Sequence, residues 1–67
     1  MICYDPLWKT MEARGETTYT LIHKHGFNAR TIHNLKHNKS ITMYTLERLC
    51  QILHCQADNV VEFTPDP

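Results

Sequence analysis

The chain has 67 residues, with seven basic side chains, seven acidic side chains and five histidines, and its net charge is zero when the histidines are neutral. A chain of this length forms a single domain with a small core, which we place at about residues 5–63. No run approaches the ~20 apolar residues of a membrane span, and no arginine-rich or long apolar leader is present. We therefore expect a cytoplasmic protein without a membrane partner.

The first helix is predicted from Asp5-Pro6, because Asp is a favoured N-cap and Pro is tolerated at the first helical position. Leu7 and Met11 lie one turn apart and are expected to face the core. Gly15 is expected to end the helix, since glycine adopts the left-handed conformation at low cost.

Two short helices with a sharp turn are predicted next. Thr17 can cap a helix over residues 18–25, Gly26 can end it, and Asn28 can cap a second helix over residues 29–37. The apolar positions of this segment are Leu21, Ile22, Phe27, Ile32 and Leu35. A helix, a glycine-containing turn and a second helix with an outward polar face form the helix-turn-helix pattern, whose second helix can enter the DNA major groove.

The same segment has an unusual charge pattern. Residues 17–39, TTYTLIHKHGFNARTIHNLKHNK, contain no Asp or Glu, and the acid-free stretch continues to Leu46. Its basic residues are Lys24, Arg30, Lys36 and Lys39, accompanied by His23, His25, His33 and His37. The molecule is neutral but this segment is basic, which favours a polyanionic partner.

A fourth helix is predicted after Asn38, which readily takes a left-handed C-terminal position, with Thr42 as its N-cap. Its apolar stripe has spacing i, i+3, i+4 and i+7 and comprises Leu46, Leu49, Cys50 and Leu53. This spacing is typical of an amphipathic core helix. Cys50 is therefore interpreted as a small buried hydrophobe rather than a zinc ligand.

A short last helix is predicted over residues 57–63, followed by a frayed tail at residues 64–67. Its apolar residues are Val60, Val61 and Phe63. A helix this short must pack one side on the domain, and the remaining apolar surface is available to a partner chain. These three residues are the expected dimerisation surface.

This order of five helices resembles the Cro and lambda-repressor type of helix-turn-helix domain, the xenobiotic-response-element family of bacterial and phage regulators. The residues that carry the likeness are Thr17, Leu21, Gly26, Phe27, Thr31, Ile32, Leu35, Asn38-Lys39, Leu46, Leu49 and Leu53. The string LERLCQILHCQADNVVEF looks like the small single-domain branch. The resemblance implies an all-α, compact five-helix domain that acts as a sequence-specific DNA-binding transcriptional regulator without a cofactor.

The resemblance also implies roles for individual residues. Base edges would be contacted by Ala29, Arg30, His33 and Asn34. The DNA backbone would be contacted by Thr18, Lys36, His37 and Lys39. Arg30 is suited to guanine O6 and N7, whereas Ala29 replaces a frequent polar residue and offers only an apolar contact, for instance to a thymine methyl group. Two residues depart from the family pattern: Asn38 replaces a common glycine, and Ile22 replaces a common small residue.

Other functions are less well supported. His33 and His37 have the i, i+4 spacing of metal ligands, but no nearby cysteine or acid completes a tetrahedral site, so we expect no metal. The polar centre of the chain has no carboxylates for acid-base chemistry, so we expect no enzyme and no catalytic residues.

The main alternative is a small helical module that binds a protein, such as an antitoxin or anti-repressor on the same scaffold. A net charge of zero favours it slightly, because DNA affinity comes largely from neutralising phosphates. The acid-free segment favours double-stranded DNA more strongly. One helix reads only a few base pairs, so we expect a homodimer on a pseudo-palindromic site.

Overall fold

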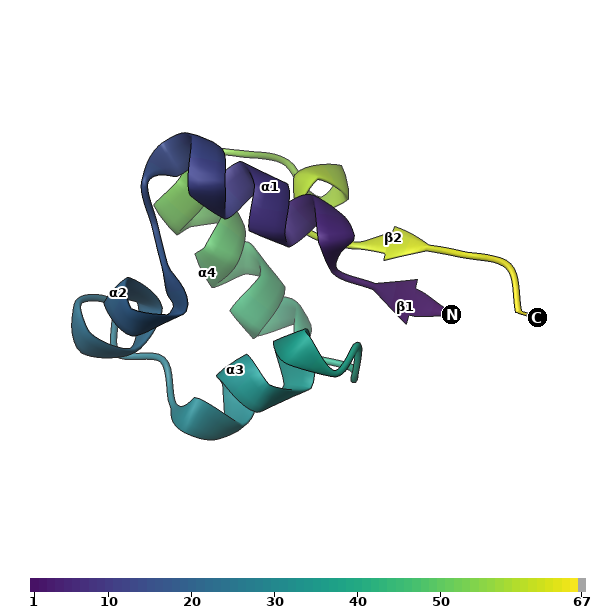
Figure 1. The fold of residues 1–67 in the computed structure, drawn as a ribbon, viewed down its shortest axis with the longest axis horizontal. Coiled ribbons are helices and arrows are strands. Elements are labelled where there is room, and N and C mark those ends of the chain that lie inside the picture. The colour runs from purple at the N-terminus through teal and green to yellow at the C-terminus, as the bar shows by residue number, and fades with distance from the viewer. Residues whose placement is uncertain (67) are drawn as a thin grey trace.

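Four α-helices, one 3₁₀ turn and a two-stranded sheet make up the fold in the computed structural model, which describes residues 1–66. In chain order they are β1 (Ile2–Cys3), α1 (Asp5–Arg14), α2 (Thr18–His23), α3 (Ala29–Lys36), α4 (Met43–Leu53), the 3₁₀ turn η1 (Ala57–Asn59) and β2 (Glu62–Phe63). Figure 1 shows α1 beside α4, α2 at the left end of the long axis, α3 along the lower side, and the sheet with both termini at the right end. Within residues 1–66, no helix has the length and apolar character needed to cross a bilayer.

The core draws on every helix. Its buried members are Tyr4, Leu7, Met11, Leu21, Phe27, Ile32, Leu35, Leu49, Leu53 and Val60. The predicted core positions in α1, Leu7 and Met11, are therefore confirmed. In α4 the apolar stripe is also confirmed, with Leu49 and Leu53 fully buried and with Leu46 and Cys50 packed at the margin of the core.

Most of the predicted helix ends are present. Gly15 ends α1 at φ 72° and Asn38 follows α3 at φ 56°, both in the left-handed region. After α3 the Lys39 N–H donates to the Asn34 carbonyl oxygen at 2.8 Å, which satisfies a carbonyl at the helix end. Three of the four predicted N-caps accept the N–H of the residue three positions later: Thr17 from Thr20, Asn28 from Thr31, and Thr42 from Thr45.

Two helix boundaries differ from the prediction. Tyr4, not Asp5, precedes the first helical residue, and its carbonyl oxygen accepts the Leu7 N–H at 2.9 Å. The Tyr4 side chain is buried, and this holds the chain in place where α1 begins. The Asp5-Pro6 pattern alone did not predict this boundary. In the second helix the regular turns end at His23, and Gly26, at φ 76°, lies in the turn beyond.

The predicted fifth helix over residues 57–63 is wrong. Only Ala57–Asn59 form a turn of 3₁₀ helix, and the chain then extends so that β2 pairs antiparallel with β1, with Ile2 opposite Phe63 and Cys3 opposite Glu62. Phenylalanine favours strands, and the partner strand lies at the other end of the chain, where no element was predicted. Thr64, in the segment expected to be frayed, donates its N–H to the Met1 carbonyl oxygen at 2.8 Å. Pro67 lies outside the described residues.

Tyr4 joins β1 to the end of α3. Its side chain is buried, and its hydroxyl donates to the Lys39 carbonyl oxygen at 2.6 Å. Its N–H donates to Asn38 Oδ1 at 3.2 Å. The N-terminal segment therefore fixes the backbone just after the candidate recognition helix.

Changing Tyr4 to phenylalanine is expected to lower the free energy of unfolding by about 1 kcal/mol, because the ring is kept and the Lys39 carbonyl loses its donor. The control is Tyr44→Phe, at a side chain that is 69% exposed, for which no change is expected. Urea unfolding of both variants measures the difference. Equal stability of Tyr4→Phe and the parent protein would show that the hydrogen bond contributes nothing.

Candidate nucleic-acid interface

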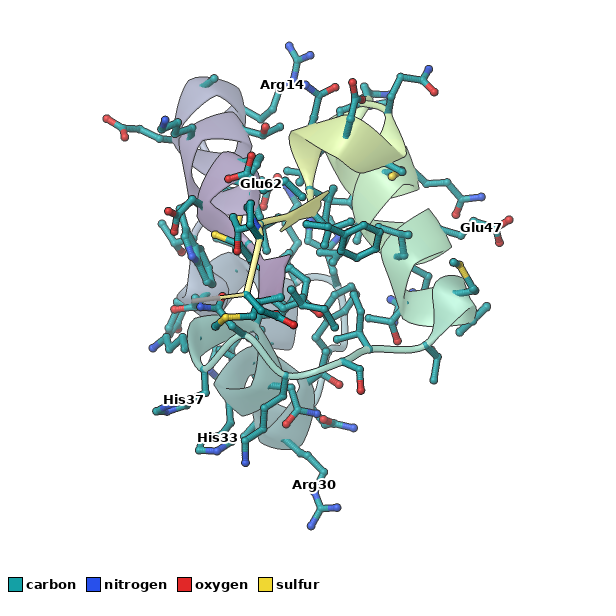
Figure 2. All side chains as sticks on the ribbon, turned by 90° about the vertical axis from the view of Figure 1, so that its right-hand side faces the viewer. Arg14, Arg30, His33, His37, Glu47 and Glu62 are labelled. Carbon is teal, nitrogen blue, oxygen red and sulfur yellow. The ribbon has the colours of Figure 1, made fainter. Side chains whose placement is uncertain are left out.

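Helix α3 presents one apolar and one polar face. Asn28 Oδ1 accepts the Thr31 N–H at 2.8 Å and so fixes the start of the helix. Ile32 and Leu35 are buried and hold the helix on the core. Figure 2 shows Arg30, His33 and His37 projecting into solvent from one end of the molecule. The polar face of α3 is therefore accessible to a binding partner.

The four predicted base-reading residues differ in exposure. Ala29 and Arg30 lie in the first turn of α3, and both are exposed, as is His33 one turn later. Asn34 is only partly exposed. The first three positions thus form an open surface, whereas Asn34 lies at its margin.

The predicted backbone-contacting residues fall on two elements. Lys36, His37 and Lys39 are exposed at the C-terminal end of α3 and just beyond it. Thr18 is the first residue of α2 and is partly exposed. Basic side chains therefore continue from the start of α3, at Arg30, to beyond its end.

Positive charge is concentrated on this surface. The rings of His33 and His37 lie 4.2 Å apart between centroids. The neighbouring charge of His37 is the largest cause that lowers the pKa of His33, followed by desolvation and by Lys39 and Arg30. An anion placed here would relieve that repulsion. Figure 2 shows the acids Glu47 and Glu62 away from the end that bears Arg30.

Arg48 of α4 supports the turn between α2 and α3. Its guanidinium donates to the His25 carbonyl oxygen and lies 4.4 Å from the centroid of the Phe27 ring. This cation–π contact and hydrogen bond hold the turn against α4. This role of Arg48 could not be predicted from the sequence, because an arginine beside an apolar stripe is usually solvated.

Glu16 lies just before the acid-free segment, and local contacts stabilise its charged form. Its Oε1 atom accepts a hydrogen bond from the Thr20 hydroxyl at 2.7 Å. His25 Nε2 lies 3.3 Å from the same oxygen, close enough for an ion pair when the imidazole is protonated. The Thr20 hydrogen bond lowers the pKa of Glu16, with His25 and Lys24 adding to the effect and burial opposing it. The i, i+4 spacing of Glu16 and Thr20 was the available sequence signal.

The described residues contain one group with metal-ligating atoms close together. Cys3, Asp5 and Glu62 each place a ligand atom within 4.8 Å of the others, at the sheet rather than at α3. Exposed carboxylates gather in this way without an ion, so the arrangement does not identify a metal site. His33 and His37 belong to no such group among residues 1–66.

Comparisons with known proteins identify the family and the fold. The crystal structure of the transcriptional regulator VanUg superimposes with a TM-score of 0.88 at 25% sequence identity, covering 97% of this chain and 87% of that chain. No curated protein gave a significant match. The family model of the Cro/C1-type HTH DNA-binding domain matches residues 6–66. The chain therefore belongs to the Cro/C1-type helix-turn-helix family of DNA-binding domains.

Proposed function

We propose that the protein is a sequence-specific transcriptional regulator that reads the DNA major groove with α3. The observation that carries this proposal is the exposed polar face of α3, which holds Arg30 and His33 and lies in a segment without a single carboxylate. Family membership and the likeness to a transcriptional regulator support the same conclusion.

Base reading is assigned to Ala29, Arg30, His33 and Asn34. Arg30 is exposed in the first turn of α3, where recognition helices of this type contact base edges. A guanidinium is suited to guanine, and the Ala29 methyl group is suited to thymine. Because Asn34 is partly covered, its contribution is expected to be smaller than that of Arg30.

Backbone contacts are assigned to Thr18, Lys36, His37 and Lys39. The Thr18 N–H lies in the first turn of α2, where N–H groups have no partner within the helix, and the helix dipole there favours a phosphate. The basic side chains at the other end of α3 would meet a second stretch of backbone. Contacts on both sides of the groove would fix the orientation of α3.

Two protomers on a pseudo-palindromic site are expected, since one α3 covers only a few base pairs. Half-sites would then lie about one helical turn, or ~34 Å, apart. The extra length of site supplies the specificity that a single small domain lacks.

The test is the salt dependence of binding to a duplex selected from random DNA. If about three to five phosphates are neutralised per protomer, log K is expected to fall with log salt with a slope of roughly −3 to −5 per protomer. Fluorescence anisotropy between about 50 and 200 mM salt measures this slope. A matched random duplex is the control for specificity.

Two results would contradict the proposal. A slope near zero would exclude the proposed phosphate contacts. An absence of binding to any duplex at micromolar protein and low salt would favour a protein-binding module, such as an antitoxin or anti-repressor, on the same scaffold.

A further inference from the structure

Two cysteines with free thiols, Cys50 and Cys55, lie at the end of α4. The helix ends at Leu53, and His54 takes a left-handed conformation at φ 53°. The Cys55 N–H then donates to the Cys50 carbonyl oxygen at 3.1 Å. This is the 6→1 hydrogen bond of a Schellman motif, in which the side chains of the two bonded residues characteristically touch. The backbone therefore brings the two cysteines side by side.

The two thiols are close enough to affect each other. Burial is the largest cause that raises the pKa of Cys50, and the charge of Cys55, a hydrogen bond with its thiol and the charge of Asp58 add to the effect. Both cysteine side chains are partly exposed and pack at the margin of the core. Cys50 therefore stays protonated at neutral pH, with a second sulfur atom within reach.

An open hollow between α1 and the end of α4 gives access to Cys55. It has a volume of about 440 Å³, and Lys9 and Arg14 of α1 form part of its wall. Within residues 1–66, its lining includes Cys55 but not Cys50. Arg14 Nε also donates to the Leu53 carbonyl oxygen at 2.9 Å, which fixes the guanidinium near the cysteine pair. A small oxidant thus reaches Cys55 first, and the two cations would stabilise an anion that leaves from it.

We propose that Cys50 and Cys55 form a modification site for hydroperoxides, in which Cys55 is oxidised first and Cys50 then forms a disulfide with it. The Cys55 thiolate attacks one oxygen of the peroxide. An S–O bond forms, the O–O bond breaks, and the second oxygen leaves as an alkoxide, or as hydroxide from hydrogen peroxide, and takes a proton from water. The Cys50 sulfur attacks the resulting sulfenic acid, an S–S bond forms, and the hydroxyl group leaves with the Cys50 proton as water. In total, two thiols give two electrons to one peroxide.

The disulfide would act on the end of α4 rather than on the recognition helix. Figure 1 shows this end of α4 beside α1 and away from α3, so DNA affinity is expected to be the same in both redox forms. Closing a loop of about six residues restricts the unfolded chain and is expected to raise the Tm by about 5–15 °C. A lower Tm in the oxidised form would show that the bond strains the helix end and would overturn the native pairing.

Peptide mapping after treatment with hydrogen peroxide tests the pair. Trypsin cleaves after lysine and arginine, so it leaves Cys50 and Cys55 together on residues 49–67 and Cys3 on residues 1–9. The reduced, folded protein is treated with peroxide and then with iodoacetamide. The 49–67 peptide is expected to be about 2 Da lighter than its dithiol form and free of alkylation, while Cys3 is alkylated. Dithiothreitol should restore both alkylation sites.

Two results of this mapping would overturn the proposal. The first is alkylation of Cys50 and Cys55 after peroxide treatment, as in the untreated protein. The second is a disulfide that forms no faster in the folded protein than in concentrated urea, because the native contact between the two thiols would then contribute nothing to the reaction.

Single variants test the order of the two steps. Cys50→Ala is expected to stop at the sulfenic acid, which dimedone traps on Cys55, whereas Cys55→Ala is expected to give at least about tenfold less adduct on Cys50. Cys3→Ala is the matched control, because Cys3 lies in β1 at the sheet, and its disulfide formation should equal that of the parent. Equal adducts on Cys50 and Cys55, in variants with the circular dichroism of the parent, would overturn the assigned order.

Discussion

Arg30→Ala is expected to weaken specific binding by about 1–3 kcal/mol per protomer and to remove the preference at one base pair of each half-site. Arg30 is exposed in the first turn of α3, outside the buried core. Its loss should therefore change affinity without changing stability. In a dimer both copies lose the contact, so the total effect is about 2–6 kcal/mol, the largest predicted for a single change.

Lys39→Ala is the matched control, because Lys39 is also exposed and basic but lies beyond the end of α3. It is expected to weaken binding to all duplexes alike and to reduce the salt slope by about one per protomer. Affinities for the selected site, for its single-base variants and for random DNA distinguish the two roles. Equal losses on specific and random DNA for Arg30→Ala would show that Arg30 contacts only phosphate.

Local signals in the sequence predicted much of the fold. Thr17, Asn28 and Thr42 cap their helices as expected, and Gly15 and Asn38 take left-handed conformations. Each of these features depends on atoms within a few residues of one another, so the local sequence is sufficient to predict them.

Contacts between distant parts of the chain were not predictable in the same way. The β1–β2 pairing joins residues about sixty positions apart, and strands of two residues carry no periodicity. A short segment such as Val60 to Phe63 is compatible with either a strand or a helix, and the pairing of Glu62 and Phe63 with β1 depends on a partner at the other end of the chain. The hydrogen bond from the Tyr4 hydroxyl to the Lys39 carbonyl oxygen could not be predicted either, because it also depends on tertiary packing.

In the candidate site, too, local features could be predicted from the sequence and tertiary contacts could not. The exposure of Ala29, Arg30 and His33 follows from helix periodicity, which places Ile32 and Leu35 in the core. The support from Arg48 depends on how α4 crosses the turn, which the sequence does not specify. The contacts of the site residues with DNA stay predictions.

DNA affinity is expected to rise as pH falls from about 8 to about 6 at constant ionic strength. In the free protein the charges of His37, Lys39 and Arg30, together with desolvation, hold the pKa of His33 below its ordinary value. The phosphates that line the groove favour the charged form of a nearby imidazole, so the pKa of His33 is expected to be higher in the complex than in the free protein. Binding therefore takes up protons.

The direction in which DNA affinity changes with pH follows from proton linkage. Between the pKa of His33 in the complex and its lower value in the free protein, the bound state holds more protons, so each fall in pH favours binding. For each proton taken up, log K changes by up to one per pH unit, and the dimer contains two copies of His33. The effect can therefore exceed tenfold.

The double variant His33→Gln with His37→Gln removes the interacting pair, whose rings lie 4.2 Å apart, and is expected to flatten the dependence on pH. His37→Gln alone removes the largest cause that lowers the pKa of His33, so it should reduce proton uptake without abolishing it. His54→Gln is the control, because His54 is exposed but lies outside the acid-free segment. Fluorescence anisotropy for the four proteins measures the slopes. If the double variant kept the parent's pH dependence, neither histidine would lie close to DNA, and α3 would have to bind DNA through another face.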